Sequence, residues 1–142
     1  MSDHRLLISK RVIEELRDRA RAARPQECCG LLVGRRDPVA IVTRTVPAKN
    51  IHEQPERFFT LDPAPHFALL REVGEAAIIG HYHSHPNGPA APSPRDLADA
   101  HDADMIWLLI DGASGDLAGF QPISDESGRV TGFAPMTLIE SP

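Results

Sequence analysis

The chain has 142 residues, of which 42% are hydrophobic and 25% charged, a composition ordinary for a globular domain with its own core. The formal net charge of −5 argues against a nucleic-acid partner, which usually requires a basic surface. No run approaches the roughly 20 apolar residues of a membrane span, and the first residues lack a signal-peptide pattern. We therefore expect one cytoplasmic domain over residues 1–142, with no membrane partner and with the adjacent Cys28 and Cys29 reduced.

The apolar periodicity predicts strands that alternate with helices. A first strand at residues 5–8 leads to Ser9, which suits the N-cap of a helix that ends at Pro25. A later strand is expected to end at Pro47, because proline cannot donate to a sheet. Further strands are expected at residues 26–33, 39–46, 58–61, 76–85, 105–110, 117–123 and 130–139.

A second helix is expected after residue 61. Asp62 suits its cap and Pro63 its first position, while Phe67, Leu70 and Val73 give it an apolar face. Mixed strands and helices with hairpins at the end predict an α/β sandwich, in which helices flank a curved and largely antiparallel sheet.

Residues 80–96 read GHYHSHPNGPAAPSPRD and hold three histidines within five residues. Because alternate side chains of a strand share a face, His81, His83 and His85 point the same way. Neighbours two apart lie roughly 6.5–7 Å from each other, so two imidazoles converge on one ion. Asp96, three residues after Ser93 in the first turn of a helix, supplies a carboxylate.

Each part of this pattern also has a simpler interpretation. Ser93, Pro94 and Asp96 suit a plain helix cap, and histidines often lie at strand ends without a chemical role. Taken together, however, they supply two nitrogens, a carboxylate and a hydroxyl. Three ligands with an open fourth position are typical of catalytic zinc.

Another acid, Glu27, directly precedes the apolar run that ends at Val33. An unpaired carboxylate is costly inside a core, so the simpler interpretation places Glu27 in solvent or beside an arginine. Zinc ligation by Cys28 and Cys29 is a weaker alternative, because two adjacent cysteines alone make a poor clamp. Cys28 has no evident role beyond packing.

Glu27 in PQECCGLLVG, followed by HSHPNGPAAPSPRD, resembles the signature of the JAMM metallopeptidases, also called MPN+ domains. That signature is an upstream glutamate, His-x-His-Pro, a short loop and Ser-x-x-Asp. The resemblance extends from the first helix to about Ile123. The short length and the stretch NIHEQPERFFTLD look most like the bacterial stand-alone members, some of which trim ubiquitin-like sulfur-carrier proteins.

The resemblance implies a single-domain MPN-like fold with one zinc ion per chain and a catalytic water. It assigns the zinc ligands to His83, His85 and Asp96, because Pro86 fixes the register; His81 is the rival first ligand.

The catalytic residues implied by the resemblance are Glu27, which moves a proton from water to the leaving amine, and Ser93, which donates to the oxyanion. The implied function is a zinc-dependent peptidase that hydrolyses the bond after the C-terminal Gly-Gly of a ubiquitin-like sulfur-carrier protein. An isopeptidase that removes such a modifier from lysine, and a catalytically silent MPN scaffold, are alternatives. The sequence names neither the carrier nor the released group, and it leaves the oligomeric state open, a homodimer included.

Overall fold

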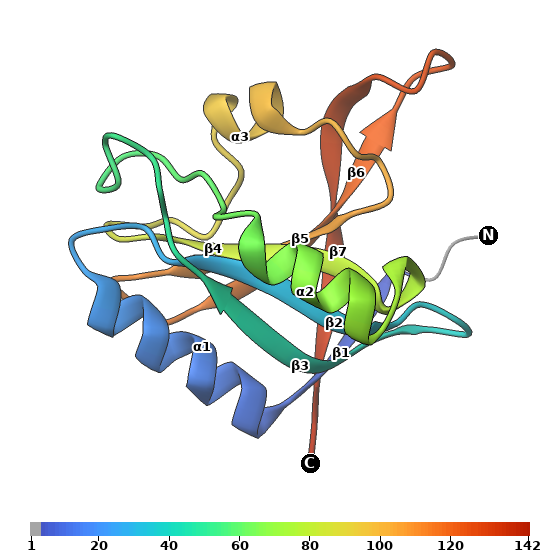
Figure 1. The fold of residues 1–142 in the computed structure, drawn as a ribbon, viewed down its shortest axis with the longest axis horizontal. Helices are drawn as coiled ribbons and strands as arrows, with labels where there is room; N and C mark the ends of the chain where they lie inside the picture. The colour runs from blue at the N-terminus through green and yellow to red at the C-terminus, as the bar shows by residue number, and fades with distance from the viewer. Residues whose placement is uncertain (1–3) are drawn as a thin grey trace.

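The structure, a computed structural model, describes residues 4–142. Along the chain the elements are β1 (Arg5–Ser9), α1 (Lys10–Ala23), β2 (Cys29–Arg35), β3 (Ala40–Ala48), α2 (Ala64–Glu72), the 3-10 turn η1 (Glu75–Ala77), β4 (Ile78–His85), α3 (Pro94–Asp99), β5 (Ile106–Asp111), β6 (Leu117–Ser124) and β7 (Val130–Ser141) (Figure 1). No helix in this described part of the chain has the length and hydropathy of a transmembrane segment.

The strands form a closed barrel in the order β1-β3-β2-β4-β5-β6-β7. β1 pairs in parallel with both β3 and β7, and β4 pairs in parallel with β5; the other pairs are antiparallel. The predicted α/β class is confirmed, and the sheet is mixed, with antiparallel pairings in the majority. The closure was not predicted, because it joins Leu6 to Leu138 from opposite ends of the chain.

The helices pack on the strands through separate apolar clusters. α1 begins as predicted, with Ser9 Oγ accepting a hydrogen bond from the Val12 N–H at 3.2 Å, and it buries Leu16 in the main core. On β2, Leu31 and Val33 pack with Leu69 of α2. On β5, Trp107 and Leu109 pack with Ala100, which follows α3. The strands therefore lie between helices, as the sequence indicated.

The predicted apolar face of α2 is wrong. Phe67 is 59% exposed, and Leu70 and Val73 are each 37% exposed, whereas Leu69 is buried. Leu69 packs on β2 and on the start of β4, so this short helix rests on the sheet through a different stripe. The helix also begins one residue later than expected, although Asp62 Oδ1 accepts from the N–H of its first residue, Ala64.

Two strand predictions are also wrong. Residues 58–61 form no strand; Leu61 makes a single bridge to Asn50. β3 continues through Pro47, which pairs with Gly30 of β2, to its end at residue 48. β1 pairs with β3 only at residues 40–42, so Pro47 has a strand on one side only, a position where proline is tolerated. Residues 49–63 instead form an irregular segment, called here the wall segment.

Candidate metal centre

The two histidines of the motif lie where β4 ends. β4 pairs with β2 and β5, and both pairings include His83. Tyr82 is fully buried in the main core, whereas the rings of His81 and His83 lie against Trp107. The rings of His83 and His85 are 5.0 Å apart between centroids. The alternation predicted for this strand is therefore confirmed.

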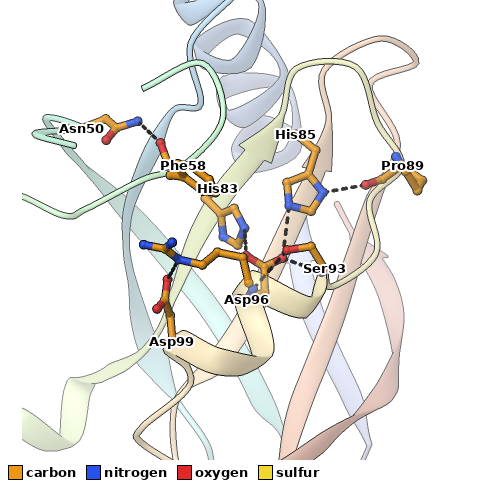
Figure 2. Close-up of polar contacts among 9 residues, drawn as sticks. Asn50, Phe58, His83, His85, Pro89, Ser93, Asp96 and Asp99 are labelled. Carbon is orange, nitrogen blue, oxygen red and sulfur yellow. Dashed lines mark hydrogen bonds and ion pairs between the residues drawn. The ribbon is translucent and has the colours of Figure 1, made fainter. Parts of the chain in front are cut away.

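Asp96 joins these two histidines from the start of α3. Its Oδ1 lies 3.1 Å from His83 Nε2, and its Oδ2 lies 3.2 Å from His85 Nε2 (Figure 2). Two ligands about 2.0–2.1 Å from a tetrahedral zinc ion lie about 3.3–3.4 Å apart. The structure therefore brings the three predicted ligands together, with each histidine facing a different oxygen of Asp96. The three residues whose ligand atoms converge within the described chain are instead Glu27, His83 and His85.

Ser93 and Asp96 form the helix cap as well. Ser93 Oγ accepts from the Asp96 N–H at 3.0 Å, and Asp96 Oδ2 accepts from the Ser93 N–H at 2.8 Å. The capping box thus fixes the orientation of the carboxylate that faces the histidines. Because Ser93 Oγ uses a lone pair in the cap, its hydroxyl proton is available to a ligand.

Glu27 completes the cluster from the loop before β2. One of its oxygens and one ring nitrogen each of His83 and His85 lie within 4.8 Å of one another. Glu27 is only 7% exposed and forms no ion pair with an arginine of residues 4–142, so the interpretation of a solvated or arginine-paired acid is wrong. Burial raises its pKa to about 7, against the opposing effect of His85.

The backbone around Glu27 is held on both sides. Its N–H donates to the Pro55 carbonyl at 2.7 Å, and Asn50 Nδ2 donates to its carbonyl at 3.0 Å. The next residue, Cys28, donates its N–H to Ser84 Oγ at 2.8 Å and accepts from the Ser84 N–H at 3.0 Å. These bonds position the Glu27 carboxylate beside the histidines, and they give the Cys28 backbone a role that the sequence did not reveal.

The charges of the cluster follow from burial and hydrogen bonding. Burial lowers the pKa of His83, which is therefore neutral near pH 7. Burial also acts to lower the pKa of His85, but hydrogen bonds to Asp96 and to the Pro89 carbonyl outweigh it and raise this pKa. Burial acts to raise the pKa of Asp96, yet hydrogen bonds from both histidines hold it well below its usual range.

The remaining ring nitrogens differ in their partners. His85 Nδ1 donates to the Pro89 carbonyl at 2.7 Å. His83 Nδ1 is buried and has no hydrogen-bond partner among the described residues, and the ring of Phe59 stacks on this imidazole. A buried nitrogen without a partner is costly.

Two imidazoles and two carboxylates are donors that zinc accepts, so these residues fit a zinc ion.

The cluster borders a cavity of about 380 Å³, within the range of small-ligand sites of about 300–1,000 Å³. Its lining includes Arg57, Phe58 and Phe59 of the wall segment and, from the loop after β4, residues 86–89, 91 and 92. The two loops project at the same end of the molecule, at left in Figure 1. The sequence indicated residues 50–58 and 87–91 as walls of the site, and the cavity lining includes Arg57, Phe58 and Asn87. Phe59, one residue further on, was not found from the sequence.

The rival ligands lie outside the cluster in the described part of the chain. His81 is buried, its ring lies 4.4 Å from that of Trp107, and it does not join the group that could hold a metal. Cys28 and Cys29 are free thiols, and Cys29 Sγ lies 3.7 Å from the Ala48 carbonyl.

The barrel and the histidine–carboxylate cluster at the end of β4 define a JAB-type domain. Residues 9–121 match the family described as "Prokaryotic homologs of the JAB domain", and the chain belongs to this family. The resemblance seen in the motif is therefore confirmed.

Relatives of known name and structure agree with this assignment. A "Probable TtuB-protein conjugate cleaving protease" of Thermus thermophilus is 35% identical over 67% of this chain and 63% of its own. A "Desampylase" of Haloferax volcanii is 30% identical over 69% of this chain and 71% of its own. The chain covers less than two thirds of the length of two of the curated relatives that it matches.

A solved structure supports the fold over nearly the whole chain. The solution structure of a protein from Desulfitobacterium hafniense superposes with a TM-score of 0.80 and 31% identity. The superposition covers 96% of this chain and 92% of that one.

Proposed function

We propose that this protein is a zinc-dependent peptidase that hydrolyses the bond after the C-terminal Gly-Gly of a ubiquitin-like sulfur-carrier protein. The observation that carries the proposal is the position of Glu27, whose pKa is raised to about 7 beside the two histidines that Asp96 joins. A carboxyl group with a pKa near neutrality is suited to both accept and return a proton.

His83, His85 and Asp96 would hold the zinc ion. A zinc ion in such a site supplies Lewis acidity, which lowers the pKa of water and polarises a carbonyl group. Asp96 contacts both imidazoles more closely than Glu27 does, so we assign Asp96 to the metal and Glu27 to proton transfer.

Glu27 takes a proton from the attacking water and returns it to the leaving amine through its carboxylate oxygens. The fixed backbone on both sides of Glu27 keeps this carboxylate beside the histidines. The Ser93 hydroxyl, whose proton is not used in the cap, donates to the oxygen of the scissile carbonyl as negative charge develops there.

The names of the relatives and the cavity support this substrate class. The Thermus relative is named for cleaving conjugates of TtuB. The stretch NIHEQPERFFTLD resembles bacterial stand-alone members, some of which trim sulfur carriers. An extended tail such as Gly-Gly can lie between Phe58 and the loop at Asn87, where main-chain hydrogen bonds supply affinity.

An isopeptidase is the second candidate, because the name of the Thermus relative specifies protein conjugates. Cleavage at a lysine side chain would use the same residues. A silent scaffold is not favoured, since all five signature residues are present: Glu27, His83, His85, Ser93 and Asp96.

Intact-mass spectrometry tests the proposal. Ubiquitin-like sulfur carriers with a short extension after Gly-Gly, and lysine conjugates of the same carriers, are incubated with the protein with and without a zinc chelator. We expect chelator-sensitive loss of the extension. Cleavage of the conjugates alone would establish the isopeptidase, and cleavage of neither would contradict both candidates.

A further inference from the structure

Two guanidinium groups lie over one aromatic ring at the rim of the cavity. The Arg95 guanidinium carbon is 4.5 Å from the centroid of the Phe58 ring, and that of Arg57 is 5.5 Å from the same centroid. All three residues line the cavity together with Glu27. Two like charges held near one ring repel each other, and a nearby anion removes this cost.

The two arginines differ in their partners. Arg95 Nε donates to Asp99 Oδ2 at 2.9 Å, so its charge is matched within the protein. Arg57 is exposed and forms no ion pair with any residue from 4 to 142, while its backbone N–H is bonded to the Gln54 carbonyl. The Phe58 ring orients the Arg57 guanidinium without neutralising it. The unmatched positive charge at this rim therefore belongs to Arg57.

The planar fork of a guanidinium matches a carboxylate with two parallel hydrogen bonds. A peptide that ends one or two residues beyond its scissile bond carries an α-carboxylate close to that bond. A conjugate through a lysine side chain has no such group there. The positive charge at the cavity rim therefore suits a short C-terminal peptide, which is released with a free α-carboxylate. It suits a lysine conjugate less well, because that conjugate has no free α-carboxylate near the scissile bond.

We infer that Arg57 binds the free α-carboxylate of the group that is released, which makes the protein selective for short C-terminal extensions. This inference rests on the proposed function and names the feature of the substrate that the site selects. Arg95, already paired with Asp99, also contacts the Phe58 ring and restrains it.

The test compares two substrates that differ in one group. A carrier with a one-residue extension after Gly-Gly is prepared as the free acid and as the C-terminal amide, and kcat/KM is measured for each. We expect the wild type to favour the acid by about tenfold, the effect of one charge-assisted hydrogen bond at a partly exposed site. In Arg57→Gln the ratio of kcat/KM for the acid to kcat/KM for the amide should fall to about one. Arg57→Lys keeps the charge but loses the planar fork, so its ratio should lie between those of Arg57→Gln and the wild type.

Arg71→Gln is the matched control, because Arg71 is exposed on α2 and is not among the residues that line the cavity. It should retain the wild-type ratio. Equal cleavage of acid and amide by the wild type, a ratio unchanged in Arg57→Gln, or the same loss in Arg71→Gln would each overturn the inference while leaving the peptidase intact. If neither substrate is cleaved, the proposed function fails, and the dissociation constants of acid and amide, measured by calorimetry on wild type and Arg57→Gln, still decide the role of Arg57.

Discussion

The phenyl ring of Phe59 stacks on the imidazole of His83, with centroids 4.1 Å apart and planes inclined by 22°. Phe59 belongs to the wall segment, which Asn50 ties down by donating to the Phe58 carbonyl at 2.9 Å (Figure 2). The same Asn50 amide donates to the Glu27 carbonyl. One side chain therefore links the proposed base to the ring that covers a proposed ligand.

Replacing Phe59 by leucine should weaken zinc binding. The imidazole of His83 has no hydrogen bond at Nδ1 within the described chain, so stacking by Phe59 restrains its orientation. Outer contacts of metal ligands are typically worth 10- to 100-fold in affinity, and we expect about tenfold here. Competition with a chromophoric chelator measures the change. Phe58→Leu is the control, since Phe58 contacts arginines and not His83; an equal loss in both variants would contradict the role given to Phe59.

The sequence predicted the proposed ligands because they lie within one continuous stretch. The alternation of a strand and the first turn of a helix place His83, His85 and Asp96 by local geometry. Glu27 required the family resemblance, since nothing local shows which distant loop faces the histidines. Phe59 was out of reach for the same reason: residues 58–61 have the pattern of a strand, but a closed barrel leaves no free edge for them to pair with.

The error on α2 has a similar cause. Phe67, Leu70 and Val73 form a regular apolar stripe, yet Leu69 faces the sheet. Periodicity identifies an apolar stripe, whereas the core-facing side is seen only in the packing of Leu69 against β2 and the start of β4.

Glu27→Gln should separate binding from chemistry. Glutamine keeps the shape of the side chain but cannot accept a proton, so turnover should fall by about 10²–10⁴-fold while zinc remains bound. Rate measurements and metal analysis of the same preparation check both parts. If the metal were lost together with the activity, Glu27 would be a ligand rather than the base.

His83→Ala should lose zinc, because a three-ligand site does not readily function with two. Asp96 offers a sharper test, since it serves both the cap and the proposed metal site. Asp96→Asn retains an oxygen that accepts from the Ser93 N–H, whereas Asp96→Ala removes it. We expect both variants to lose zinc and Asp96→Ala alone to lose the hydrogen bond from the Ser93 N–H, worth about 1 kcal/mol in unfolding free energy. Metal analysis and denaturation of the zinc-free proteins distinguish them; zinc retained in either variant would remove Asp96 from the ligand set.

Ser93→Ala should lose both stability and rate. Its hydroxyl caps α3, and the loss of such a cap costs about 1 kcal/mol. The loss of an oxyanion donor should lower kcat by a further factor of about 10²–10³. Ser9→Ala is a matched control, because Ser9 caps α1 in the same way but lies outside the cavity lining. For Ser9→Ala we expect a destabilisation of similar size with unchanged kcat. If kcat were the same in both variants, Ser93 would act only as a helix cap and not as an oxyanion donor.

The stability of the zinc-free protein should depend on pH through Glu27. Its pKa is raised from 4.5 to about 7 by burial, so between these values the folded state holds a proton that the unfolded state has released. Stability therefore falls as pH rises from about 4.5 to about 7. The full shift corresponds to at most about 3 kcal/mol, and solvent in the cavity reduces this amount.

Urea denaturation at several pH values, with a chelator present, checks the effect against Glu27→Gln. The amide does not titrate, so the unfolding free energy of the variant should increase relative to that of the wild type as the pH rises towards 7. The pKa of His85 is also raised, in part by the charge of Glu27, so the comparison reports the titration of this coupled pair. A constant difference between the two proteins across this range would mean that Glu27 is ionised in the folded state throughout, and the raised pKa on which its assignment as the proton carrier rests would be wrong.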